Sequence, residues 1–306
     1  MTTQCASALL MVRPRFFRSN EETQSSNSFQ QSADANIEEQ ALAEFDHVVN
    51  RLQKQGIYII TAENDNPETP DAVFPNNWVS FHHDGRVIIY PMMAPSRRKE
   101  RANKILDLVK DKFQSASIID LTHWEEKNKF LEGTGSVVFD HQHKIAYASL
   151  SSRTHDDVLD DLCNQLGYKK FVFHAELNGQ PIYHTNVVMH IGEKYAVACL
   201  ECIADSKERN ELRRMLAFTG HELVNITAAQ MRHFAGNMLE VCNEAGKHYT
   251  LLSSNAIRSL HLPDINIIGE STELLSFDIP SIEKAGGGSI RCMMAEIFCP
   301  VKTSVG

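Results

Sequence analysis

The stretch NVVMHIGEKYAVACLECIADSKERNELRRMLAFTGHELVNI, residues 186–226, holds three apolar runs and one long charged segment. The apolar runs are short and rich in β-branched residues, which is typical of strands. The segment SKERNELRRMLAFTG, residues 206–220, lies between the second and third runs and is typical of a surface helix. This stretch therefore predicts the order strand, strand, helix, strand.

The same order recurs elsewhere in the chain. Upstream, VVFD (137–140) and KIAYASL (144–150) precede a predicted helix over about 155–166 and the strand KKFVFH (169–174). The units share no sequence identity, and no GxGxxG motif is present, so a doubly wound sheet is disfavoured. We expect a single α/β domain, residues 1–306, whose four or five units close radially around a central channel.

The composition is that of a globular protein, with 42% hydrophobic and 23% charged residues. The net charge of −9 argues against a nucleic-acid partner, and we interpret the basic cluster SRRKER (96–101) as a solvated helix start. No apolar segment reaches membrane-spanning length and no signal-peptide pattern opens the chain, so the expected location is the cytoplasm, without a membrane partner. The sequence leaves open whether copies of the chain form a homo-oligomer.

The seven cysteines have no disulfide-framework spacing, which suits free thiols in a reducing compartment. Cys199 and Cys202 form a CxxC pair inside an apolar run, without a second pair at zinc spacing. We interpret them as buried structural residues. No set of His, Asp and Glu has metal-ligand spacing, so the sequence predicts neither a metal nor another cofactor.

A glycine-rich run precedes one cysteine in GGGSIRCMMAEIF, residues 286–298. It could be a linker ahead of a buried thiol in an apolar strand. Alternatively, the backbone must turn tightly or approach a ligand, so that Cys292 is presented to it.

Polar residues also stand where other strands are expected to begin. Glu132 lies in FLEGTGSVVFD, His184 in PIYHTNVVMHIG and Asn237 in HFAGNMLEV, while Asn76 and Asn77 follow a proline in PDAVFPNNWVSF. Each alone has an ordinary explanation as a turn residue or a hydrogen-bonded core residue. Together, Cys, His and Glu supply a nucleophile, a general acid/base and an anion for a cationic substrate.

Seven motifs in order carry a family resemblance: PDAVFPNNW, MAPSRRKE, LEGTG, SLSSRT, YHTNV, AGNMLEV and GGGSIRCM. The chain resembles the guanidino-group-modifying superfamily, which includes arginine deiminases, dimethylarginine dimethylaminohydrolases and amidinotransferases. It is most similar to the hydrolases of citrulline utilisation. The resemblance implies the pentein fold, a five-bladed α/β propeller of ββαβ units. It also implies hydrolysis, without a cofactor, of C–N bonds in a small guanidino or ureido amino acid of the arginine or citrulline type.

The resemblance also implies roles for individual residues. Cys292 matches the nucleophile, His184 the general acid/base and Glu132 the carboxylate that holds the guanidinium. His184 is then expected to titrate near the working pH. The remaining candidates are expected to bind the substrate or to support its pocket: Asn20 at the edge of the polar loop 19–36, Asn76, Asn77, Arg97, Arg98, Arg153 and Asn237.

Asn76 and Asn77 depart from the family pattern, because deiminases and dimethylaminohydrolases usually carry a carboxylate there. A neutral amide suits a ureido group, whereas a carboxylate facing it would be an uncompensated buried charge. We therefore expect ammonia release that continues to ornithine and carbon dioxide. An amidinotransferase, or a deiminase or dimethylaminohydrolase that stops at citrulline, remains an alternative. A non-catalytic binding protein would be expected to lose Cys, His or Glu, and no protease signature surrounds Cys292.

Overall fold

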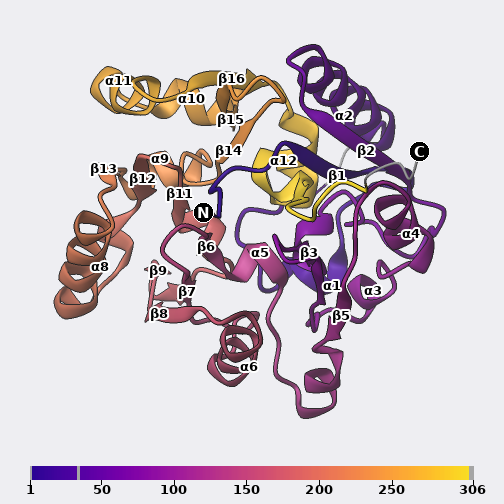
Figure 1. Ribbon diagram of the computed structural model, residues 1–306, viewed down its shortest axis with the longest axis horizontal. Coiled ribbons are helices and arrows are strands. Elements are labelled where there is room, and N and C mark those ends of the chain that lie inside the picture. Colours follow the sequence, from indigo (N-terminus) through magenta and orange to yellow (C-terminus); the bar gives the residue numbers. More distant parts are fainter. Residues whose placement is uncertain (1, 33–34, 303–306) are drawn as a thin grey trace.

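The computed structural model describes residues 2–32 and 35–302. It contains five three-stranded sheets with the same arrangement of strands (Figure 1). In each sheet the middle strand is antiparallel to the first strand and parallel to the third. A two-stranded hairpin, β9 (Glu176–Leu177) and β10 (Gln180–Pro181), stands apart from them. The sheets are β17 (Ala295–Glu296), β1 (Ala8–Arg13) and β2 (Tyr58–Glu63); β3 (Val79–Phe81), β4 (Arg86–Ile89) and β5 (Ser117–Asp120); β6 (Val138–Asp140), β7 (Ile145–Ser149) and β8 (Lys169–Phe173); β11 (Met189–Ile191), β12 (Tyr195–Ala198) and β13 (Glu222–Asn225); β14 (Leu239–Cys242), β15 (His248–Ser253) and β16 (Glu273–Phe277).

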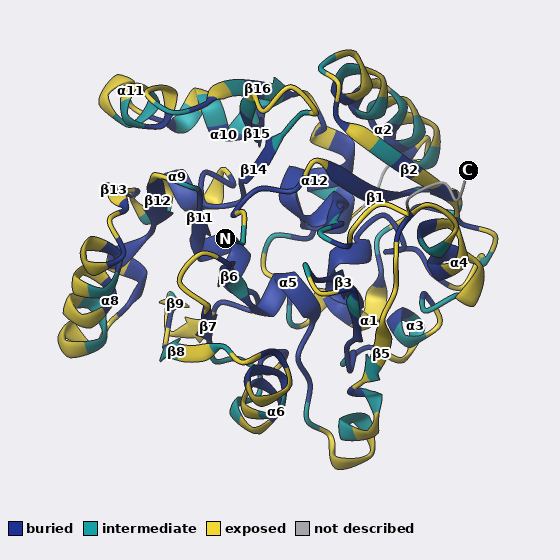
Figure 2. Cartoon of the chain, in the orientation of Figure 1, coloured by how far each residue is buried: buried dark blue, intermediate teal, exposed yellow. Residues whose placement is uncertain are grey.

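Helices connect the middle and third strands of each sheet, because a parallel pair needs a crossover. In α2 the apolar residues recur at helical spacing, so that Ala41, Phe45, Val48 and Leu52 are buried. Figure 2 shows that the crossover helices turn exposed faces outward while the inner strands are buried. The crossover helices are α2 (Ile37–Lys54), α3 (Pro95–Arg98), α4 (Asn103–Lys112), α6 (Asp156–Leu166), α8 (Ser206–Phe218), α10 (Ser254–Ser259) and α11 (Leu262–Gly269). The predicted order of strand, strand, helix and strand is confirmed for residues 186–226.

The first sheet combines residues from distant parts of the chain. In β17, Ala295 and Glu296 pair with Leu10 and Leu9 of β1, which in turn lies parallel to β2. Single bridges join Ala6 to Val241 and Phe81 to Ile297, and so connect this sheet to its neighbours β14 and β3. The mixed α/β fold is thus built of separate sheets, and no closed barrel is found among the described residues.

Several segments differ from their predicted structure. Cys292 lies in a 3₁₀ turn, η4 (Ile290–Met293), and not in a strand. Likewise, α7 (Thr185–Val188) occupies the start of the predicted strand at Asn186, and η3 (Leu200–Cys202) follows β12 in the CxxC segment. Short apolar runs do not distinguish strands from buried helical turns, which explains these errors.

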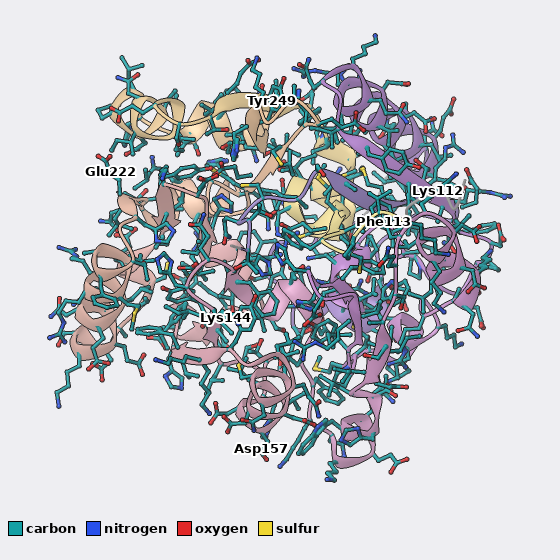
Figure 3. The ribbon with its side chains drawn as sticks, viewed as in Figure 1. Lys112, Phe113, Lys144, Asp157, Glu222 and Tyr249 are labelled. Atoms are coloured by element: carbon teal, nitrogen blue, oxygen red, sulfur yellow. The ribbon has the colours of Figure 1, made fainter. Side chains whose placement is uncertain are left out.

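The polar loop 19–36 contains a short helix, α1 (Glu21–Gln24), and its residues 33–34 lie outside the described residues. The basic cluster SRRKER is not fully solvated, because the Arg97 side chain is buried. In Figure 3 the charged residues Lys112, Asp157 and Glu222 lie at the edge of the molecule. None of the helices in the described ranges is long and apolar enough to span a membrane.

Candidate active site

Four short helical turns pack together near the centre of the molecule. Glu132 directly precedes α5 (Gly133–Ser136), and His184 directly precedes α7. The turn η1 (Pro75–Asn77) contains both asparagines of the pair, and η4 contains Cys292. The helix α5 contacts η1 and α7, and η1 also contacts η4. Turns far apart in the sequence therefore bring these polar residues into one region.

This region encloses a small cavity, and five of the predicted site residues line it. Cys292 and His184 are among them and are both almost fully buried, which suits chemistry that excludes bulk water. The lining residues are Thr23, Asn27, Asp71, Phe74, Asn77, Arg97, Arg153, Tyr183, His184, Gly286, Gly287, Gly288 and Cys292.

The three glycines end α12 (Pro280–Gly286) and form the turn that leads to the nucleophile candidate. Gly287 has φ +64°, a left-handed conformation that favours glycine. A Cβ on Gly286 would lie 2.6 Å from the Phe74 ring, and one on Gly288 would lie 3.2 Å from Cβ of Cys292. The run is therefore a tightly packed cavity wall and not a linker.

Two asparagine amides surround the sulfur of Cys292. Nδ2 of Asn237 lies 3.4 Å from Sγ, and Nδ2 of Asn186 lies 3.6 Å from it. Asn237 also donates to the Asn186 carbonyl and accepts a hydrogen bond from the Arg291 backbone. Burial raises the pKa of Cys292, although these hydrogen bonds oppose the shift. The thiol is therefore protonated at neutral pH.

His184 is held by a buried carboxylate. Its Nε2 lies 2.8 Å from Oε2 of Glu132. Burial raises the pKa of Glu132, but Arg153 and His184 outweigh it, so that the pKa lies well below its ordinary value. Burial lowers the pKa of His184 to about 4. The neutral imidazole therefore donates from Nε2 to the ionised Glu132, and Nδ1 remains available as an acceptor.

Glu132 forms further hydrogen bonds with protein groups besides His184. Oε1 accepts from the Met93 backbone N–H at 3.0 Å, and Oε2 also lies 3.4 Å from Nη1 of Arg153. Both oxygens are thus already engaged, and Glu132 is not among the residues that line the cavity. This geometry fits a residue that orients His184 better than one that holds a guanidinium by itself.

The amide of Asn77 has a defined orientation. Nη1 of Arg97 donates to its Oδ1 at 2.7 Å. Arg97 also forms a bidentate ion pair with Glu100. Nδ2 of Asn77 has no partner among the described residues. A Cβ on Gly135 would collide with this Nδ2 and with Nδ1 of His184, so the two nitrogens flank the same space. Asn77 therefore offers a donor close to His184.

Besides Glu132, four predicted residues do not line the cavity. Asn76 donates to Oγ1 of Thr134, and Asn237 donates from Nδ2 to the sulfur of Cys292. Asn20 caps α1 and donates to Asp71. The Arg98 guanidinium points elsewhere: it donates to the backbone carbonyls of Met92 and Met93 and forms an ion pair with Glu125.

Several residues of the cavity region were missed by the sequence interpretation, and two of them have a buried side-chain oxygen without a partner among the described residues. Asp71 lines the cavity, and its Oδ1 is buried without a partner among the described residues. Burial raises the pKa of Asp71, although Arg97 and the hydrogen bond from Asn20 oppose the shift. Asn186 contacts the sulfur, and its Oδ1 is likewise unpartnered within the described ranges. Both stand inside motifs of the family resemblance, PDAVFPNNW and YHTNV, which was the available signal.

The segment around α1 contributes to the cavity wall. Nη2 of Arg153 donates to the Thr23 carbonyl and to Oγ of Ser26, at 3.1 Å and 2.6 Å. Asn27 Nδ2 lies 3.3 Å from the carbonyl of Gly287. Arg153 therefore connects this segment to Glu132, and its guanidinium is largely occupied by protein groups.

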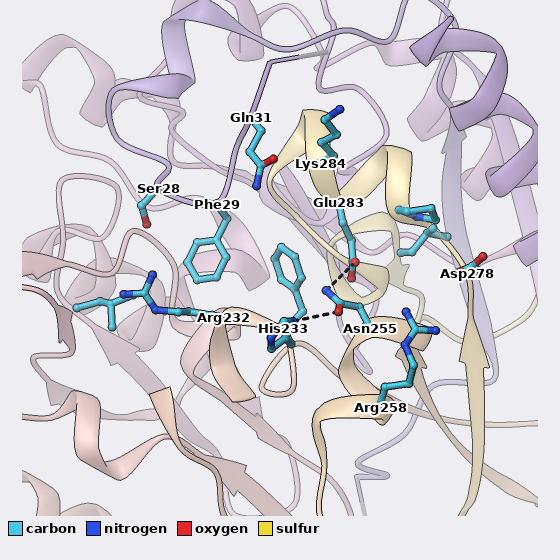
Figure 4. Close-up of a pocket in the computed structure, with 14 residues that line it drawn as sticks. Ser28, Phe29, Gln31, Arg232, His233, Asn255, Arg258, Asp278, Glu283 and Lys284 are labelled. Carbon is cyan, nitrogen blue, oxygen red and sulfur yellow. Dashed lines mark hydrogen bonds between the residues drawn. The ribbon is translucent and has the colours of Figure 1, made fainter. Parts of the chain in front are cut away.

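A larger, more open pocket lies beside the Gly-rich turn (Figure 4). Glu283 lines it, and Oε1 of Glu283 accepts a 2.6 Å hydrogen bond from Oγ of Ser289. Nδ2 of Asn255 lies 3.4 Å from Oε2, and His233 in turn contacts Asn255. The Ser289 carbonyl accepts from the backbone N–H of Cys292. Glu283 thus supports the turn that carries the thiol.

A family model described as N,N dimethylarginine dimethylhydrolase, eukaryotic, matches residues 13–299. The chain belongs to this family. The matched range includes the candidate residues Glu132, His184 and Cys292. The predicted kinship with guanidino-group-modifying enzymes is therefore confirmed. No curated protein matches the chain at a significant level of sequence similarity.

Solved structures share the fold of this dimethylarginine dimethylhydrolase family member. The N-terminal domain of ArgZ, an arginine dihydrolase from Cyanobacteria, matches with a TM-score of 0.74 at 12% identity, over 96% of this chain and 98% of that one. AgrE, solved with ornithine and NAD⁺, matches with a TM-score of 0.72 at 16% identity, over 99% of this chain and 41% of that one. A dimethylarginine dimethylaminohydrolase adduct with S-methyl-L-thiocitrulline matches with a TM-score of 0.67 at 15% identity, over 97% and 100%.

Proposed function

We propose that this protein is a cysteine hydrolase that cleaves C–N bonds of a guanidino or ureido amino acid through an S-linked intermediate. The observation that carries the proposal is the buried cavity shared by Cys292 and His184, with Glu132 fixing the tautomer of His184. The family match supports a guanidino substrate.

In the proposed mechanism, Nδ1 of His184 accepts the proton of the Cys292 thiol. The thiolate attacks the central carbon of the substrate, and the resulting imidazolium protonates the departing nitrogen. His184 then takes a proton from water, whose oxygen attacks the S-linked carbon and releases Cys292. The ionised Glu132 stabilises the imidazolium in both steps. Asn186 and Asn237 donate toward the sulfur and favour its thiolate form.

The polar groups that face the cavity support arginine as the substrate. The free Oδ1 of Asp71 suits a cationic group, and the free Nδ2 of Asn77 suits the oxygen of a ureido group; neither atom has a partner among the described residues. We propose that arginine is converted to citrulline and ammonia, and that citrulline is then hydrolysed to ornithine, carbon dioxide and a second ammonia. The cytoplasm remains the proposed location, because it keeps the free thiols reduced.

A dimethylarginine hydrolase is the second candidate, and the family match favours it. It would release dimethylamine and stop at citrulline. Purified protein incubated separately with arginine, dimethylarginine and citrulline distinguishes the two by the release of ammonia, dimethylamine and ornithine. Ornithine from both arginine and citrulline supports the first proposal, and citrulline with dimethylamine supports the second. Failure of all three substrates, with the thiol intact, would contradict both.

We also propose that the five sheets are the blades of one α/β propeller, residues 1–306, around the cavity. The contacts of η1, α5, α7 and η4 at the centre support this arrangement. A single cooperative unfolding transition, detected alike by circular dichroism and by tryptophan fluorescence, is expected. Two separated transitions would contradict a single domain.

A further inference from the structure

A second cluster of ionisable side chains lies outside the proposed active site. It contains Cys5, Glu193, Glu240 and His248, whose candidate ligand atoms all lie within 4.8 Å of one another. Cys5 precedes β1, Glu193 lies between β11 and β12, Glu240 belongs to β14 and His248 to β15. Three of the five sheets therefore meet at this cluster.

The cluster contains two carboxylates, those of Glu193 and Glu240, and one side chain that can carry a positive charge, His248. Oε1 of Glu240 lies 2.7 Å from Nδ1 of His248, and Oε2 of Glu193 lies 3.5 Å from Nε2 of the same ring. Within the described residues, the ion pairs found for these two carboxylates go to His248 alone. Glu240 is 2% exposed, so its charge depends on His248 and on the backbone N–H of Glu193, which donates to Oε2 at 2.8 Å.

We propose that Cys5, Glu193, Glu240 and His248 bind one divalent transition-metal ion of the zinc class. A thiolate, an imidazole and carboxylates are ligands that Zn²⁺ accepts, whereas Mg²⁺ and Ca²⁺ prefer oxygen ligands alone. Ligand atoms at tetrahedral zinc distances lie about 3.3–3.8 Å apart, so the widest pairs of the cluster need to close by roughly 1 Å, while Glu240 and His248 need to separate slightly.

The burial of the four residues fits such a site. Cys5 and Glu240 are buried, while Glu193 and His248 are partly exposed and leave a path for the ion. Binding would release the thiol proton of Cys5 and any second proton of His248 to solvent. The bound ion would hold the segment before β1 against β11 and β14, where Gln4 already donates to the Ile191 carbonyl at 3.2 Å. Its role would be structural.

The test uses Co²⁺ as a spectroscopic probe and a Cys292→Ser background, so that the proposed nucleophile cannot bind the ion. Equilibrium dialysis should give about one Co²⁺ per chain, with thiolate-to-cobalt charge-transfer absorption that Zn²⁺ abolishes by competition. Cys5→Ser should remove this absorption, and the partly exposed Glu193→Gln should weaken binding at least about tenfold. Both variants are checked for native folding by circular dichroism.

Cys242→Ser is the matched control, because Sγ of Cys242 lies 3.7 Å from the Cys5 carbonyl while Cys242 is outside the cluster. It should keep the full absorption, as should Cys202→Ser in the CxxC pair. The proposal is overturned if no Co²⁺ binds, or if folded Cys5→Ser and Glu193→Gln bind as the background does. In that case a protonated His248 balances the carboxylates of the cluster by itself.

Discussion

Nη1 of Arg97 donates to Oδ1 of Asn77 at 2.7 Å, and this contact leaves the amide nitrogen of Asn77 as the group available beside His184. Arg97 is itself fixed by Glu100. The orientation of the amide is therefore determined by the protein before a substrate binds. A donor at this position favours a substrate oxygen over a substrate N–H group.

Asn77→Asp should shift preference from citrulline toward arginine. The substitution replaces the free N–H donor of Asn77 with a carboxylate oxygen, which accepts hydrogen bonds. Arg97 would compensate part of the new negative charge. We expect the ratio of kcat/KM values for arginine and citrulline to rise at least about tenfold, or about 1.4 kcal/mol. Asn77→Ala is the control and should weaken both substrates without this shift. An unchanged ratio in Asn77→Asp would show that the amide does not select the substrate.

Cys292→Ser should abolish turnover with the fold intact, because the hydroxyl is a much weaker nucleophile under these conditions. Cys199→Ala and Cys202→Ala remove buried thiols outside the set of residues that line the cavity, and should cost about 1–3 kcal/mol of stability at most. Ammonia release and urea unfolding measure the two effects. Near-normal turnover by Cys292→Ser would rule out the covalent mechanism.

The pH dependence should follow the low pKa of His184. Burial lowers this pKa to about 4, so His184 is neutral and able to accept a proton throughout the neutral range. As the pH falls through about 4, the ring becomes protonated and kcat/KM should decline. Sequence reasoning expected titration near neutrality, which differs from this value. A decline in kcat/KM already centred near about pH 6.5, the ordinary pKa of histidine, would contradict the structural assignment.

Gly287→Ala should be strongly destabilising. Gly287 has φ +64°, and a Cβ there would lie 2.6 Å from Nδ2 of Asn27. Gly179→Ala is a matched control, because Gly179 has φ +75° and no atom of the described residues lies within 4 Å of the added Cβ. The control should lose about 1 kcal/mol from backbone strain, and Gly287→Ala should lose more and also reduce kcat. Equal losses in urea unfolding would show that packing at the turn is unimportant.

Glu283→Gln should reduce kcat by about tenfold with a small effect on KM, because its contact with Ser289 positions the turn before Cys292. Asp278→Asn is the control: it lines the same pocket but is exposed. Steady-state kinetics of both variants test this prediction. Equal activity of Glu283→Gln and the wild type would remove Glu283 from the support of the site.

The sequence was most informative where local patterns suffice. The apolar runs and charged segments predicted the repeated unit, and ordered motifs pointed to Cys292, His184, Asn77 and Arg97, which the structure places around one cavity. Prediction failed where distant segments meet. The approach of Cys5 to Glu240 depends on how three sheets pack, and no local spacing encodes it. The burial of Arg97 was missed because its partner Glu100 compensates a charge that composition alone assigns to solvent.

The pairing of β17 with β1 joins two segments from nearly opposite parts of the chain. Cys292 lies just before β17, and its surroundings include groups from Asn186 and Asn237. While a ribosome is still making residues 295–296, the edge of β1 that they cover stays open, and long-range pairings of this kind form late. The contacts around the Cys292 thiol are therefore completed only after nearly all of the five sheets have been synthesised.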